Sequence, residues 1–474
     1  MRFHAVPLLV LCIAARAAAA ADPIAIEVPS AILKETRRVR VSLPASFART
    51  PPGRRYPVTV VLDGGSLLAP VETVSRELAR NGQIPEMILV AIENSSRLRD
   101  LTPPGLSVSG SSLAEGGDRF LDFLEKELLP RIDEDFRGGA PRTLVGHSSG
   151  GILVTYAAAT RPAFRVNVAL DTPIQLGEGW LAKKLLARAK AGGEPVRYVS
   201  YSARFDWPEA DWRALGAAAP RSWKLHHERL ERETHETMPM LGAYLGLREA
   251  FSDTSRIAAM PAGTPPPTTS ILPYYDRLSA SYGAPIAPPE ALLRDVVEDL
   301  LVEGRGTEAR AAYQRLAMLY GEPVDGDAQK ARIAEVEKRP PPSETVESLL
   351  ATPFPSLQEM KGYLGTWTGT NWIEPASRTR WSLILREDAG RVAGEIVGYP
   401  APGVELKRPL EYLKVHPAGL AFGTMNGMRP RGMLLYEGKR TGDLLEGEMR
   451  WGGVSFRMLD GSPPPVIRFE LRRP

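Results

Sequence analysis

The chain has 474 residues, and its 59 lysines and arginines nearly balance its 56 aspartates and glutamates, which leaves a formal net charge of +3. Charges of both signs are interspersed, as in Glu228-Arg229 and Glu231-Arg232, so we expect no nucleic-acid surface. The length suggests about three domains.

The N-terminal segment has the pattern of a secretory signal peptide. Arg2 precedes an apolar stretch from 6 to 15, and small residues follow up to Ala21. We expect residues 1–21 to be removed. Cys12 lies inside the apolar stretch, so the mature chain would have no disulfide and no sulfur ligand for a metal. No later stretch is apolar over the 18 or so residues of a membrane span, which predicts a periplasmic or secreted protein.

Residues 22–257 alternate between strand and helix patterns and form the predicted catalytic domain. The apolar runs 57–63 and 87–92 are typical of strands that are buried on both faces of a parallel sheet. Apolar residues recur at helical spacing from 118 to 136. We therefore predict the α/β class, with a mainly parallel sheet between helices and an antiparallel strand pair at 26–43.

One segment, residues 142–156, indicates the chemistry. A β-branched strand leads into Gly146-His147-Ser148-Ser149-Gly150, and an apolar helix follows. This is the nucleophile elbow of an α/β-hydrolase, with Ser148 as the nucleophile. The NH of Ser149 would stabilise a substrate oxyanion, and we expect the second donor to be the NH of Gly65, in the loop after the 57–63 strand.

The general base follows from elimination among six histidines. Only His235 lies in a loop between the last predicted strand and the last helix of the domain, where the fold requires the base. The acid should follow the strand 196–200, and Asp206 is nearest to its end, with Glu209 and Asp211 as open alternatives. A zinc motif beginning at His235 would need a second histidine at Pro239, so we expect no metal and no cofactor.

The remaining chain has two parts. Residues 258–345 combine a proline-rich linker with helical periodicity that resembles a degenerate tetratricopeptide pair, for which we expect a structural role. Residues 355–474 show short alternating segments between glycine turns, typical of an antiparallel β-barrel-like domain. The start Gly365-Thr366-Trp367 is similar to that of lipocalin-like barrels. Either a cavity for an apolar ligand or an interior filled by side chains is compatible with this pattern.

Residues 24–290 resemble the family of α/β-hydrolases called putative esterases, which includes esterase D-like enzymes and enterobactin-type siderophore esterases. The resemblance is carried by five segments: 61–64, 92–103, 120–130, the elbow 146–151, and 233–239. It implies a serine esterase with its Ser/His centre at Ser148 and His235, and an active-site rim formed by 94–103.

We therefore predict a serine carboxylic ester hydrolase that forms an acyl-enzyme on Ser148 with a small-molecule ester. An acyltransferase with the same Ser/His centre is one alternative, and a non-catalytic ligand-binding protein is another. The sequence does not identify the acyl group, the alcohol or the oligomeric state.

Overall fold

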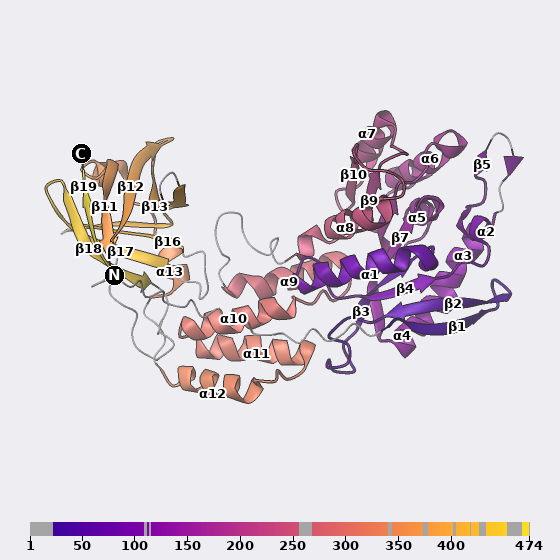
Figure 1. Cartoon of the computed structure of the whole chain (residues 1–474), viewed down its shortest axis with the longest axis horizontal. Coiled ribbons are helices and arrows are strands. Elements are labelled where there is room, and N and C mark those ends of the chain that lie inside the picture. Colours follow the sequence, from indigo (N-terminus) through magenta and orange to yellow (C-terminus); the bar gives the residue numbers. More distant parts are fainter. Residues whose placement is uncertain are drawn as a thin grey trace, which may run out of the picture. The chain divides into compact units, whose positions relative to one another are not determined.

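The structure is a computed structural model that describes residues 22–108, 111–112, 115–255, 268–339, 344–372, 378–401, 404–417, 419–425, 433–452 and 467–473. It divides into two compact units, Met1–Ser252 with Ala280–Pro285, and Asp253–Ser279 with Ile286–Pro474 (Figure 1). The predicted signal peptide lies outside the described residues. Within them, no helix combines the length and apolar composition that crossing a membrane requires.

The first unit is built on an eight-stranded sheet with the order β1-β2-β4-β3-β7-β8-β9-β10. Its strands are β1 (Ile24–Ser30), β2 (Glu35–Ser42), β3 (Tyr56–Val61), β4 (Ile88–Ile92), β7 (Gly138–His147), β8 (Phe164–Leu170), β9 (Arg197–Ser202) and β10 (Lys224–Arg229). The pairs β1–β2 and β2–β4 are antiparallel, and all others are parallel. Every residue of β3 and β4 is buried, as their continuous apolar runs predict.

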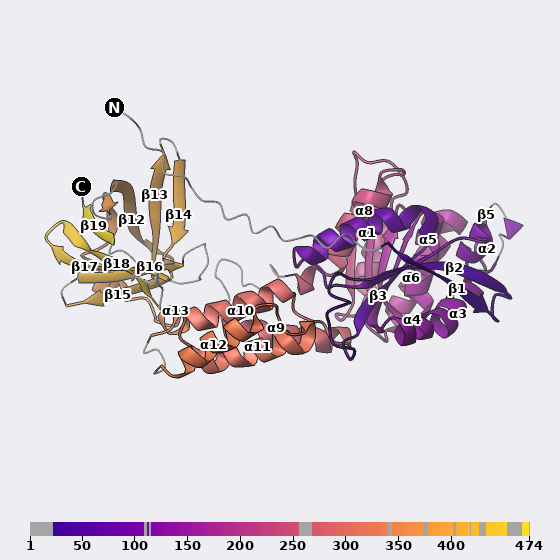
Figure 2. The ribbon, with the colours of Figure 1, turned by 60° about the horizontal axis from the view of Figure 1, so that its bottom comes forward.

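Helices cover both faces of this sheet (Figure 2). They are α1 (Gly64–Arg80), α2 (Arg97–Leu101), α3 (Gly117–Phe123), the π-helical turn η1 (Leu124–Leu128), α4 (Leu129–Asp135), α5 (Ser149–Thr160), α6 (Leu176–Ala191), α7 (Glu209–Ala218) and α8 (Met238–Ala250), with a two-stranded hairpin of β5 (Ser107–Val108) and β6 (Ser111–Ser112). Helix α1 packs against α8, whereas α5 packs against α2 and α6. This architecture confirms the predicted α/β-hydrolase fold class.

The second unit begins with helices. They are η2 (Ser252–Thr254) and α9 (Thr268–Tyr282), which both cross the unit boundary, α10 (Glu290–Val302), α11 (Gly306–Tyr320), α12 (Gly326–Glu337), α13 (Val346–Leu350) and α14 (Leu357–Met360). Helix α11 packs between α10 and α12, and Leu293, Leu316 and Tyr320 are buried in one apolar cluster. The helical periodicity of this region therefore reflects a packed core.

A nine-stranded antiparallel sheet completes the second unit, with the order β14-β13-β12-β11-β19-β18-β17-β16-β15. The strands are β11 (Gly365–Trp372), β12 (Arg378–Asp388), β13 (Arg391–Ala401), β14 (Val404–Pro409), β15 (Tyr412–His416), β16 (Gly419–Met425), β17 (Met433–Thr441), β18 (Leu444–Gly452) and β19 (Ile467–Arg472). The sheet curls into a half-barrel, so the predicted antiparallel β domain is confirmed. Trp367, Trp381, Phe422 and Phe469 pack together in its core, which matches an interior filled by side chains.

Candidate active site

Ser148 occupies a strained turn between β7 and α5. Its backbone has φ 57° and ψ −119°, a conformation that L-residues rarely adopt. The turn closes tightly, because a Cβ atom on Gly146 would lie 2.5 Å from the backbone carbonyl carbon of Gly150. The NH of Ser148 donates to the carbonyl of Leu170 at 2.9 Å, which fixes the serine against the end of β8. Sequence and structure agree on this local geometry.

The imidazole of His235 is held by a carboxylate that the sequence analysis did not select. His235 lies between β10 and α8, and its Nδ1 is 2.6 Å from Oδ2 of Asp171, the residue that follows β8. Asp171 is fully buried. Its other oxygen, Oδ1, accepts hydrogen bonds from the NH groups of Ala203, Arg204 and Phe205 at 2.8, 2.8 and 3.0 Å. Both oxygens of the carboxylate are therefore engaged.

These contacts determine the charge of Asp171. Burial acts to raise the pKa of its carboxyl, but the backbone NH groups of the 203–205 segment and His235 together outweigh burial, so the pKa lies below its ordinary value of 3.8. Asp171 is thus a carboxylate at neutral pH. In this state it can fix the tautomer of His235 and stabilise its protonated form.

Asp206 is not the partner of His235, which corrects the sequence-based choice. Its Oδ1 lies 2.7 Å from Nε2 of His227, and it also accepts hydrogen bonds from the Ser202 hydroxyl at 3.0 Å and the Trp207 NH at 2.9 Å. Asp206 therefore closes the 202–207 loop on itself and attaches it to β10. The same loop supplies the three NH groups that bind Asp171.

The two alternative acids lie in the first turn of α7. Glu209 is exposed there and forms an ion pair with Arg213. Asp211 is half-buried, and its carboxylate lies near Gly179 of α6. Among the described residues, Asp171 and not Glu209 or Asp211 is the carboxylate that binds His235.

His147, which the sequence analysis set aside as part of the elbow, packs against the proposed base. The His147 and His235 rings have centroids 4.3 Å apart, and Phe205 meets His235 edge-on at 5.6 Å. Burial, followed by the nearby His235, lowers the pKa of His147. A neutral His147 places no positive charge beside the ring of His235.

His147, Asp171 and His235 offer three possible metal ligands within 4.8 Å of one another. However, the carboxylate already binds His235 through one oxygen and three NH groups through the other. This hydrogen bonding fits an oriented acid–imidazole pair better than a metal centre, since metal coordination would have to displace these contacts.

The loop from β3 to α1 supplies the other side of the site. Asp63 has a positive φ of 54°, and α1 begins immediately after it. The NH groups of Ser66 and Leu67 both bond to the carbonyl of Asp63, while Gly65 is exposed in the first helical turn. The first amide groups of a helix have no partner inside it, so the NH of Gly65 is a suitable oxyanion donor.

A salt bridge joins this loop to the elbow. Arg97 binds both carboxylate oxygens of Asp63, with Nε 2.7 Å from Oδ1 and Nη2 2.9 Å from Oδ2, and Asn94 also donates to Oδ1. The Nη1 group of Arg97 donates to the hydroxyl of Ser149 at 3.1 Å. The hydrogen bond to Asp63 raises the pKa of Arg97. The segment that the resemblance predicted at the rim thus links Asp63, at the start of α1, to Ser149, at the start of α5.

A strained serine at a strand-to-helix turn, on the same sheet edge as a buried carboxylate–imidazole pair, is the arrangement of an α/β-hydrolase. Residues 30–211 match the family model described as "Putative esterase". The resemblance stated from the sequence is therefore confirmed over this part of the chain, which includes Ser148 and Asp171 and ends before His235.

Two curated proteins and one solved structure illustrate the similarity. The siderophore triacetylfusarinine C esterase of Aspergillus fumigatus is 32% identical over 168 residues, or 32% of this chain and 55% of that protein. The uncharacterized protein YbbA of Bacillus subtilis is 29% identical over 133 residues, which cover 27% of this chain and 52% of that protein. The chain spans about half the length of these curated relatives. The structure of an IroE-like serine hydrolase from Shewanella oneidensis matches with a TM-score of 0.51 and 24% identity. The match covers 66% of this chain and 99% of that chain, and it supports the fold.

Proposed function

We propose that the protein is a serine hydrolase of carboxylic esters, exported to the periplasm or the cell exterior. The observation that carries the proposal is the buried Asp171–His235 pair at the end of β8, beside the strained Ser148 at the end of β7. The family match and the named esterase relative support the reaction class.

The reaction divides into acylation and deacylation. His235 accepts the proton from the Ser148 hydroxyl while Oγ attacks the ester carbonyl, and Asp171 stabilises the resulting imidazolium. The NH groups of Ser149 and Gly65 stabilise the tetrahedral oxyanion. His235 then protonates the departing alcohol. A water molecule resolves the acyl-enzyme by the same steps in reverse order, and the free acid leaves.

A covalent probe tests this proposal. A fluorophosphonate should label the wild-type protein once, at Ser148, and Ser148→Ala should remove the label and lower the turnover of p-nitrophenyl acetate by several powers of ten. Ser222→Ala, at an exposed serine away from the site, is the matched control and should retain both. Turnover that survives in Ser148→Ala would contradict the mechanism.

A further inference from the structure

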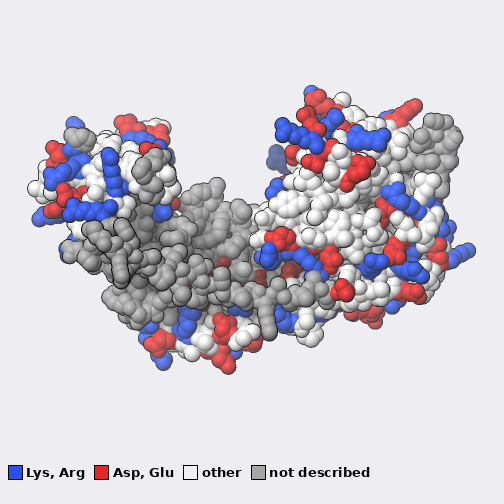
Figure 3. Space-filling model, in the orientation of Figure 1, with Lys and Arg blue, Asp and Glu red and all other residues white. Residues whose placement is uncertain are grey.

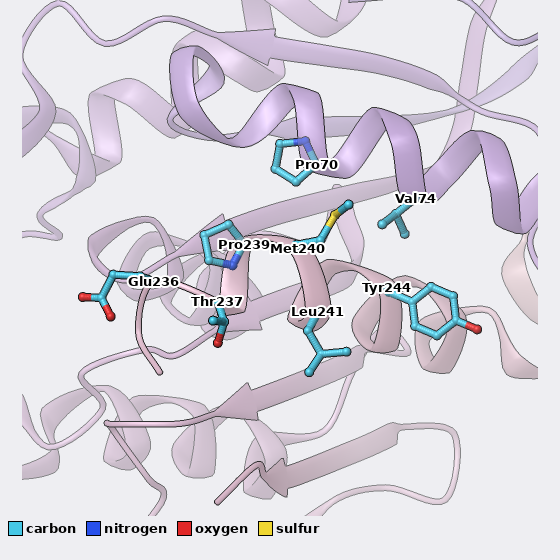
Figure 4. Close-up of a pocket in the computed structure, with 8 residues that line it drawn as sticks. All are labelled: Pro70, Val74, Glu236, Thr237, Pro239, Met240, Leu241 and Tyr244. Atoms are coloured by element: carbon cyan, nitrogen blue, oxygen red, sulfur yellow. The ribbon is translucent and has the colours of Figure 1, made fainter. Parts of the chain in front are cut away.

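An apolar hollow of about 560 Å³ lies between α1 and α8. Figure 4 shows side chains of α1 on one side of it and side chains of the 236–244 segment on the other. Its lining consists of Pro70, Val74, Glu236, Thr237, Pro239, Met240, Leu241 and Tyr244. In Figure 3, the area at the place of α8 in Figure 1 has few charged side chains on the visible face, and charged side chains border it. We call this hollow the α1–α8 groove.

The topology brings one end of the α1–α8 groove to the catalytic edge of the sheet. Helix α1 follows β3 directly, and α8 follows the loop after β10. Strands β3 and β10 point in the same direction, because every pairing from β3 to β10 is parallel. Both helices therefore begin at the edge where Ser148 lies. Glu236 and Thr237, which line the groove, directly follow His235.

The exposure of the lining favours an apolar occupant. Met240 is 51% exposed, although Val74 opposite is buried. Covering this apolar surface is favourable, because the methylenes of a ligand and the wall of the groove are both removed from water. The carboxylate of Glu236 lies at the end next to His235 and would repel an anionic group there. An uncharged chain that extends from the ester group meets both conditions.

We propose that the α1–α8 groove binds an unbranched apolar chain of the ester substrate while the carbonyl lies at Ser148, so that medium-chain esters are preferred over acetates. This inference rests on the proposed function and extends it to a substrate class. The chain belongs either to the acyl group or to the alcohol, which share the same chemistry.

Two substrate series test the proposal on the full chain. One runs from p-nitrophenyl acetate to the decanoate and lengthens the acyl group, and the other runs from ethyl to octyl acetate and lengthens the alcohol. In one series kcat/KM should rise about twofold to fourfold for each methylene that enters the groove. The series that rises identifies which part of the ester is bound. Flat profiles in both series would overturn the proposal.

A groove-filling variant makes the test specific. In the series that rises, Met240→Trp should lower the ratio of kcat/KM between the eight-carbon and the two-carbon substrate about tenfold, because an indole occupies the space for the chain, and Met240→Asp should do the same without adding bulk. Met318→Trp is the matched control, at a methionine that is 57% exposed on α11, and should leave the preference unchanged. If both Met240 variants kept the wild-type preference for the longer substrate, the groove would not be the site that binds the chain.

A binding measurement separates this inference from the proposed function. Calorimetry with 2-decanone, an uncharged ketone analogue of the ester, should show binding to Ser148→Ala and weaker binding to Ser148→Ala/Met240→Trp. Ketone binding in a protein that hydrolyses no ester would support the groove and contradict the esterase. Acetate hydrolysis without ketone binding would support the esterase and overturn the groove.

Discussion

Oδ2 of Asp171 lies 2.6 Å from Nδ1 of His235, although 64 positions separate the two residues in the chain. Asp171 follows β8, the strand next to the elbow strand β7, and its other oxygen is held by the NH groups of the 203–205 segment. The carboxylate therefore cannot rotate away from the imidazole without losing three hydrogen bonds. This fixed orientation is what a general base needs from its acid partner.

Asp171→Asn should lower kcat by about three to four powers of ten. The amide oxygen can still accept the NH groups of the 203–205 segment, so the loop should fold normally. The amide NH₂ would then face Nδ1 of His235 and favour the tautomer that carries its proton on Nε2, which cannot accept the proton of Ser148. Steady-state kinetics and circular dichroism of the variant provide the measurement.

Asp206→Asn is the matched comparison, because it alters the carboxylate that the sequence analysis selected. We expect it to reduce kcat by about tenfold or less, since Asp206 contacts His227 rather than His235. A larger loss in Asp206→Asn than in Asp171→Asn would reverse the assignment of the acid.

The sequence predicted the parts of this molecule that depend on local pattern. Continuous apolar runs identified β3 and β4, and the spacing of Gly146, Ser148 and Gly150 identified the turn. The role of His235 as the base, also chosen from position, stays a prediction. For β3, β4 and the turn, the relevant information lies within about ten residues of chain, whereas the choice of His235 used the order of strands and helices over the whole domain.

The acid depended on contacts that no local pattern contains. Asp171 and Asp206 both lie in loops after neighbouring parallel strands, so the order of the strands does not distinguish them. His227 engages Asp206, and the NH groups of the 203–205 segment turn toward Asp171. The position of Asp171 directly after a buried strand was a usable signal, whereas the salt bridge from Arg97 to Asp63 had none.

The stability of the first unit should fall in acid as Asp171 takes up a proton. Its pKa in the folded state lies below 3.8, so its contribution to the free energy of unfolding is fully present above pH 3.8 and is lost as the pH falls through the lower, folded-state pKa. Asp206, whose pKa is also lowered, contributes with the same sign. Thermal unfolding between about pH 5 and pH 2 should show a shallower decline for Asp171→Asn, and the shallowest for Asp171→Asn/Asp206→Asn. Parallel curves for all three proteins would exclude this linkage.

Arg97→Met should act on catalysis through the position of the two proposed oxyanion donors, the NH groups of Ser149 and Gly65. The guanidinium joins Asp63, which directly precedes the first turn of α1 with Gly65, to the hydroxyl of Ser149, and a methionine keeps the bulk without the hydrogen bonds. We expect kcat to fall about tenfold to a hundredfold with little change in KM, because oxyanion stabilisation acts on the transition state.

Arg97→Lys should recover only part of this loss, since an ammonium cannot bind both oxygens of Asp63 in a fork. Arg213→Met removes an exposed ion pair with Glu209 on α7 and serves as the control. A rise in KM at constant kcat in Arg97→Met would instead assign the arginine to substrate binding.

Gly151 and Thr172 form a contact that couples the nucleophile helix to the acid loop. A Cβ atom on Gly151 would lie 2.0 Å from Oγ1 of Thr172 and 3.0 Å from its Cβ. Gly151→Ala should therefore displace the residue that follows Asp171 and destabilise the fold by about 1–3 kcal/mol, with a further loss of activity.

Oγ1 of Thr172 is buried and has no hydrogen-bond partner among the described residues, so Thr172→Ala alone should cost little. The double variant Gly151→Ala/Thr172→Ala should recover most of the lost stability and activity, because it removes the atom in closest contact, and denaturant unfolding of the four proteins measures the coupling. Additive effects in this cycle would show that the two residues do not meet.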